Sequence, residues 1–159
     1  MADRKVFTAA MFTAVLLLAG AFALPRFFFF FELAKSSIYF GIAALAYYAE
    51  ERYAYMLGMI APPVWFFVDW MAGTLSNDFR VLARYSLGGS VAPLETPLHG
   101  LARLAAIALF VASVHAWRKE VPEKVFGKTF WRGLAVSLAY VVALTVWYFS
   151  SFSGGNGVH

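Results

Sequence analysis

Six side chains that could do chemistry stand within or beside the apolar stretches of this 159-residue chain: Glu32, Lys35, Asp69, His99, Arg103 and His115. A charged side chain inside a membrane segment is costly, so it indicates either an ion pair or a functional site. Asp69 lies in the run PVWFFVDWMAG, shortly after Pro62 and Pro63. A proline-broken helix with an acid nearby is typical of the discontinuous helices of transporters.

Asp69 is also close to the end of its apolar run, because Asn77 and Asp78 follow soon after it. We therefore predict that Asp69 lies near a membrane interface, stays ionised and hydrated, and tolerates Asp69→Asn. The alternative is a buried ion pair of Asp69 with Arg103, across two helices. Arg103 can instead pair with Glu95 or extend its side chain to the interface.

Glu32 and Lys35 are three residues apart on a predicted helix. This spacing places them on one helical face, where they can pair. We predict a structural pair rather than a proton relay.

His99 and His115 are 16 residues apart on one predicted helix, which separates them by about 24 Å. The third histidine is His159, so the chain by itself cannot build the bis-histidine haem site of a b-type cytochrome. His99 and His115 are candidate single ligands of a haem or a chlorophyll-type pigment. The alternative is that each is a polar residue at an interface, and bound lipids are expected in either case.

Other catalytic chemistry has little support in the sequence. The chain has no cysteine, which excludes disulfides, iron–sulfur clusters and thiolate metal sites. The HExxH, GxSxG and P-loop patterns do not occur. The sequence leaves enzymatic activity undecided and favours a non-catalytic protein.

The elements that must position these residues are membrane helices. The chain is 62% hydrophobic and only 14% charged, which is more apolar surface than a soluble domain of this size can bury. We predict an all-α integral membrane protein with one domain over residues 1–152 and a flexible tail over 153–159. Five transmembrane spans and one interfacial helix are expected, at 6–24, 27–49, 53–71, 98–117 and 131–152, with the interfacial helix at 78–87. The alternative is a bundle of four spans, in which one long bent helix runs through 33–60.

The first span also has features of a signal peptide. Its 19 apolar residues, Val6–Leu24, favour a retained helix. The third span is expected to be broken at Pro62 and Pro63.

Basic residues predict the topology. Five of the 13 lysines and arginines lie within 118–132, so this loop is expected in the cytoplasm of a multi-pass cell-membrane protein. The N-terminus is expected on the same side and the C-terminus on the opposite side. The basic residues are assigned to topology and anionic lipid, and no nucleic-acid partner is expected.

Small residues recur at every fourth position in the last two predicted spans. Ala108, Ala112 and Ala116 form one row, and Ala135, Ala139 and Ala143 form another, with Gly133 and Ser137 on a second row beside it. Rows of this kind allow close helix approach in membranes. We predict that the last two spans pack together as a tight antiparallel pair.

Three functions are compatible with these features. The first is a non-catalytic subunit of a larger membrane complex that handles electrons or light, with other membrane subunits and the bilayer as partners. The second is a small oligomeric transporter or channel that uses Asp69 and Arg103. The third is an interfacial enzyme acting on lipid or quinone through His99 and Glu95.

Overall fold

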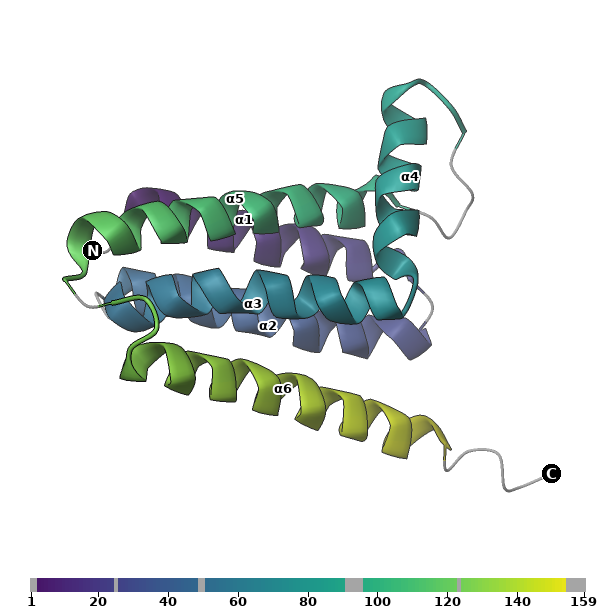
Figure 1. Ribbon diagram of the computed structural model, residues 1–159. Helices are drawn as coiled ribbons and strands as arrows, with labels where there is room; N and C mark the ends of the chain where they lie inside the picture. Colours follow the sequence, from purple (N-terminus) through teal and green to yellow (C-terminus); the bar gives the residue numbers. More distant parts are fainter. Residues whose placement is uncertain (1–2, 25, 49–50, 91–95, 123, 154–159) are drawn as a thin grey trace.

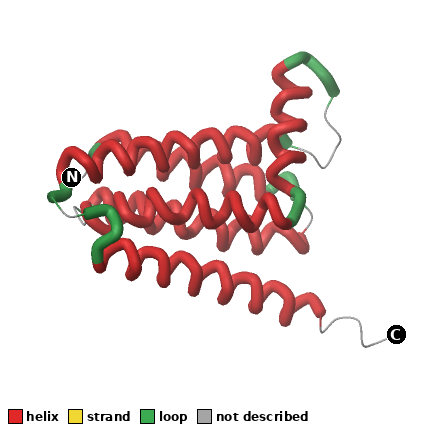
Figure 2. The backbone as a smooth tube through the Cα atoms, viewed as in Figure 1, coloured by secondary structure: helices red, strands yellow, loops and turns green. Residues whose placement is uncertain are grey.

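The computed structural model describes residues 3–24, 26–48, 51–90, 96–122 and 124–153. These residues form six α-helices and no strand. The helices are α1 (Arg4–Ala21), α2 (Arg26–Tyr47), α3 (Glu51–Met71), α4 (Thr74–Ser86), α5 (Pro97–Glu120) and α6 (Lys128–Ser153). The five long helices run alongside one another, and α4 stands across one end of the bundle (Figures 1 and 2). The predicted all-helical bundle is confirmed.

Helices α1, α2, α5 and α6 are each long and apolar enough to cross a membrane. Helices α3 and α4 pass the same test only together, with a bend of 93° between them. Four or five spans therefore fit the described residues, as expected for a multi-pass membrane protein. A single bent helix through 33–60 is wrong, because α2 ends at Tyr47 and α3 begins at Glu51 and returns alongside it.

The helix boundaries follow from local chemistry. Asp3 caps α1 by accepting a hydrogen bond from the backbone N–H of Lys5, and Thr96 caps α5 just before Pro97. The break expected at the two prolines is not found, because α3 continues through both of them. The chain bends instead at Gly73, whose φ of 73° is open to glycine without strain.

Helix α4 is amphipathic and packs against α5 through its inner face, where Val81 is buried. The close approach depends on Gly100, because a Cβ there would lie 2.7 Å from both the Asp78 carbonyl oxygen and the Leu82 Cβ. The short helix expected over 78–87 is thus present and begins four residues earlier, at Thr74.

The predicted pairing of the last two long helices is wrong. Among the described residues, α6 contacts α3 and α2 but not α5, which packs on α1, α3 and α4. The row Ala135, Ala139 and Ala143 is exposed, and the row of Gly133 and Ser137 faces the bundle instead. A Cβ on Gly133 would lie 3.0 Å from the Met56 side chain of α3.

Helices α1 and α3 occupy the inner face of α5, where Gly58 of α3 lies so close to Ser113 that an added Cβ would be 2.2 Å from the serine oxygen. The opposite face of α5 keeps Leu104 and Val111 exposed, so an open face on α5 did not attract α6. Helix α6 packs on α3 instead. Small residues fix how closely helices approach, but they do not specify the partner.

Candidate functional site

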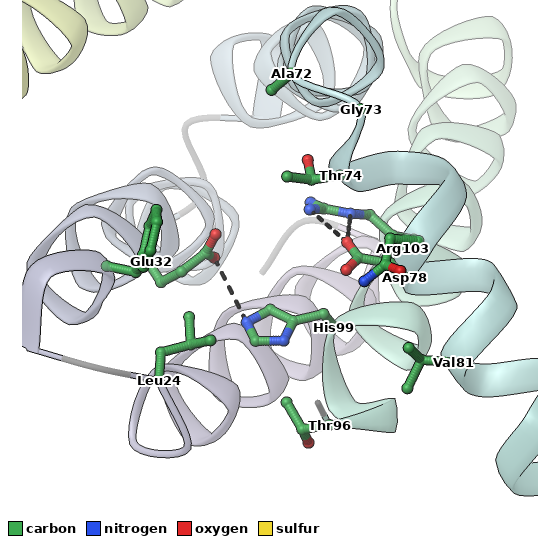
Figure 3. Close-up of a pocket in the computed structure, with 12 residues that line it drawn as sticks. Leu24, Glu32, Ala72, Gly73, Thr74, Asp78, Val81, Thr96, His99 and Arg103 are labelled. Carbon is green, nitrogen blue, oxygen red and sulfur yellow. Dashed lines mark hydrogen bonds and ion pairs between the residues drawn. The ribbon is translucent and has the colours of Figure 1, made fainter. Parts of the chain in front are cut away.

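Ionisable side chains from four helices meet at the end of the bundle that α4 covers. They are Glu32 and Lys35 from α2, Asp69 from α3, Asp78 from α4, and His99 and Arg103 from α5. Figure 3 shows four of them, Glu32, Asp78, His99 and Arg103. Helices α2 and α5 begin at this end, and α3 finishes there. The antiparallel arrangement therefore gathers residues that are up to 71 positions apart in the sequence.

Asp69 is the centre of the site and is only 4% exposed. Its two carboxylate oxygens accept hydrogen bonds from Lys35 Nζ at 2.7 and 2.9 Å. Arg103 Nη1 lies 2.8 Å from Asp69 Oδ2. The expectation of a hydrated interfacial carboxylate is wrong, because α2 and α5 each supply a cation to it. The alternative prediction, an Asp69–Arg103 pair, describes the structure.

Arg103 bridges two carboxylates, and it is itself only 3% exposed. Its Nε and Nη2 donate to Asp78 Oδ2 at 3.1 and 2.9 Å. Two donors of one guanidinium on one carboxylate oxygen fix the orientation of both groups, since the guanidinium is rigid and planar. Arg103 thus ties α4 and α3 to α5. Its other predicted partner, Glu95, lies outside the described residues.

Lys35 has no exposed surface. Besides Asp69, its ammonium lies 3.7 Å from Glu32 Oε1 and 5.1 Å from the centre of the Trp65 ring. The Glu32–Lys35 contact predicted from their spacing is therefore present, but it is the weaker of the two carboxylate contacts of Lys35. Asp69, on another helix, is the stronger partner.

A cavity of about 390 Å³ lies beside this network. Polar and charged residues from α2, α4 and α5 line it, and apolar side chains such as Leu24 and Val81 close it. The His99 ring packs against the backbone of Gly20, where a Cβ would lie 3.0 Å from the ring. Figure 3 shows His99 between Glu32 and the Asp78–Arg103 pair.

Two atoms in this cavity keep unused hydrogen-bonding capacity. His99 Nε2 and Glu32 Oε2 are buried, lie 4.0 Å apart, and have no hydrogen-bond partner within the described part of the chain. Each carboxylate group and each cation deeper in the site, by contrast, is paired. Hydrogen-bond partners for a ligand are therefore available at Glu32 and His99.

The charges of the site do not cancel. Three carboxylates (Glu32, Asp69, Asp78) against two cations (Lys35, Arg103) leave one negative charge when His99 is neutral. A buried excess charge is unfavourable. One proton or one bound cation at Glu32 or His99 would restore neutrality.

His115 does not belong to this site. It is exposed on α5, toward the opposite end of that helix, beside a groove that Asp3 and Lys5 also line. The two predicted cofactor ligands are therefore not brought together. No group of three or more His, Cys, Asp or Glu side chains that could hold a metal ion occurs in the described residues.

The opposite end of the bundle has a polar contact that the sequence reading missed. The buried Tyr55 hydroxyl accepts from the backbone N–H of Asp3 at 2.8 Å and donates to Glu120. Asp78 was also missed as a site residue. Asp78 is three and four residues before Val81 and Leu82, and this spacing places it on the apolar face of α4. A carboxylate on that face could have been predicted to point into the bundle.

Comparisons of this chain with protein-family models, with curated proteins and with solved structures give no match.

Proposed function

We propose that the protein is a small multi-pass membrane transporter linked to protons, and that its solute binds in the charged site beneath α4. The observation that carries the proposal is a network of six ionisable side chains from four helices. Four of them, Glu32, Asp78, His99 and Arg103, line one cavity (Figure 3). Ionisable residues within membrane helices are rare, and they mark substrate, ion or proton pathways when they face a cavity.

The bend between α3 and α4 supports this assignment. Transporter sites are commonly built where a membrane helix is interrupted. Here the interruption at Gly73 places Thr74, Asn77 and Asp78 on the cavity wall. The helix break thus supplies polar ligands to the same site that Asp69 and Arg103 organise.

The proton link is supported by the charge count and the two unpartnered atoms. Glu32 and His99 face the cavity and are not tied into the Asp69–Arg103 network by hydrogen bonds. In our proposal this pair exchanges a proton for a solute cation. Lys35, Asp69, Arg103 and Asp78 hold the geometry around it.

The proposed orientation places the site toward the outside of the cell. The basic loop 118–132 and the N-terminus lie at the end of the bundle opposite α4. The positive-inside rule assigns that end to the cytoplasm. The cavity at Glu32 and His99 then faces the external solution.

Recording currents from vesicles on a solid support tests the proposal. We expect a jump to lower external pH to give a charge displacement in wild-type vesicles that exceeds that of protein-free vesicles. Glu32→Gln should abolish this displacement, whereas Glu51→Gln, at the other end of the bundle, should retain it. Identical currents from wild-type and protein-free vesicles would refute the proposal.

A second candidate function is that of a non-catalytic subunit in a larger membrane complex, and one observation favours it. Helix α6 packs on one side only, and its outer face exposes both its alanine row and large apolar side chains such as Trp131 and Val142. A partner helix fits such a face. A native mass in mild detergent that contains other chains would support the subunit, and a homo-oligomer would support the transporter.

A further inference from the structure

A second cavity reaches the charged site from the side of the bundle. It has a volume of about 260 Å³ and lies between α2, α3 and α6. Its walls are mostly apolar, with Phe31 and Val68 among them, and they also include the polar residues Asp69 and Thr145. Four residues line both this cavity and the polar one beneath α4: Phe28, Glu32, Ala72 and Thr74.

Glu32 therefore stands at the junction of a polar cavity and an apolar one. Its side chain is 12% exposed, and its Oε2 atom has no hydrogen-bond partner among the described residues. Its Oε1 atom is 3.7 Å from Lys35, which is too long for a hydrogen bond. The junction thus offers a carboxylate whose accepting capacity is largely unused.

The chemistry of this junction selects a cation with hydrogen-bond donors. Both site cations are already held by carboxylates, Lys35 by Asp69 and Arg103 by Asp69 and Asp78. An anionic ligand would meet three carboxylates and no unpaired cation. A positively charged N–H donor would complete the hydrogen bonding of Glu32 and neutralise the one excess negative charge.

The second cavity sets the shape of the ligand. If each methylene group takes about the 30 Å³ that a water molecule occupies in the liquid, the apolar cavity holds roughly eight such groups. Each methylene group that leaves water on binding strengthens the binding about fourfold. A ligand with a hydrocarbon tail would therefore bind much more tightly than its polar head alone.

We propose that the site binds an amphipathic cation, an alkyl amine or alkyl guanidine, with its head at Glu32 and its tail in the cavity between α2, α3 and α6. This inference names the solute class for the proposed transporter and rests on that proposal for the transport step. The binding step stands on the two cavities and Glu32.

Octylguanidinium is a suitable probe, because its guanidinium stays charged at every pH used and its tail has about the volume that the cavity accepts. Binding is measured by titration calorimetry on the full chain in phosphatidylcholine nanodiscs, with empty nanodiscs subtracted. We expect octylguanidinium to bind at least tenfold more tightly than either guanidinium, which lacks the tail, or octanol, which lacks the charge.

Two variants separate the head from the tail. Glu32→Gln should weaken octylguanidinium binding at least tenfold, while Glu51→Gln should bind as wild type. Thr145→Phe fills the apolar cavity from α6, so it should weaken octylguanidinium binding and leave guanidinium binding unchanged. Equal octylguanidinium affinity in wild type and Glu32→Gln would overturn the head assignment, and equal affinity in Thr145→Phe would overturn the tail assignment.

The two proposals fail in different ways. Tight, Glu32-dependent binding without a pH-jump current in vesicles would keep the ligand class and reject the transporter. A Glu32-dependent current without selective octylguanidinium binding would keep the proton-linked transporter and reject the amphipathic cation.

Discussion

Replacing Asp69 by asparagine removes the one carboxylate that contacts both buried cations. Arg103 keeps a second partner, because Asp78 still accepts two hydrogen bonds from it. Lys35 does not: it is fully buried, and its remaining contacts are Glu32 at 3.7 Å and the Trp65 ring at 5.1 Å. The perturbation therefore acts mainly on Lys35.

The expected size follows from leaving a buried ammonium poorly compensated. Breaking a buried pair by removing one partner costs on the order of 3–5 kcal/mol in the free energy of unfolding. At about 2–4 °C for each kcal/mol in a chain of this size, the melting temperature should fall by roughly 6–20 °C. Thermal unfolding in mild detergent, followed by tryptophan fluorescence, measures this shift.

The double variant Lys35→Met with Asp69→Asn tests the assignment to Lys35. It removes the stranded cation, so it should recover at least half of the loss, and Arg103→Gln with Asp69→Asn should recover less. Glu51→Gln serves as the control for a carboxylate far from the site. The reasoning fails if Asp69→Asn melts within about 2 °C of wild type, or if the Lys35→Met double variant is no more stable than Asp69→Asn alone.

Three further predictions concern the packing and the topology. Gly100→Ala should force α4 away from α5 and destabilise the protein by about 1–3 kcal/mol. Gly41→Ala, where an added Cβ meets nothing within 4 Å, should not lower the melting temperature. Equal melting temperatures of the two variants would contradict the close contact at Gly100. Ala139→Leu should leave the melting temperature unchanged because Ala139 is exposed on α6, and a clear loss of stability would show that this face is packed in the native assembly. With single cysteines at Val125 and Asn156, an impermeant thiol reagent added to intact cells should react only with the cysteine at position 156. Equal labelling of the two positions would reject the proposed topology.

The sequence predicted the helices well and their partners poorly. Apolar runs of about 20 residues determine where helices form, because every backbone group must be hydrogen-bonded in an apolar medium. The expected ranges match α1, α2, α3, α5 and α6 to within a few residues. The sequence did not predict which helices pack together. The row of Ala135 and Ala139 and the row of Gly133 and Ser137 satisfy the same small-residue pattern, so the pattern could not tell which row faces a neighbour.

The site shows the same division. The residue types were visible in the sequence, since Glu32, Lys35, Asp69 and Arg103 are charges in apolar surroundings. Their environment was not visible. Asn77 and Asp78 follow Asp69 closely in the sequence and so predicted a hydrated interface, whereas the fold buries Asp69.

What the sequence by itself determined is the list of costly side chains and the helices that carry them, because charge and hydropathy are local properties. Only the tertiary structure decided that Lys35 and Arg103 share Asp69, that Asp78 closes the network from α4, and that Glu32 keeps an unused acceptor between two cavities. Pairing of charges depends on distances of a few ångströms between helices. Those distances are set by how glycines such as Gly58 and Gly100 let the helices approach, and by the turn at Gly73.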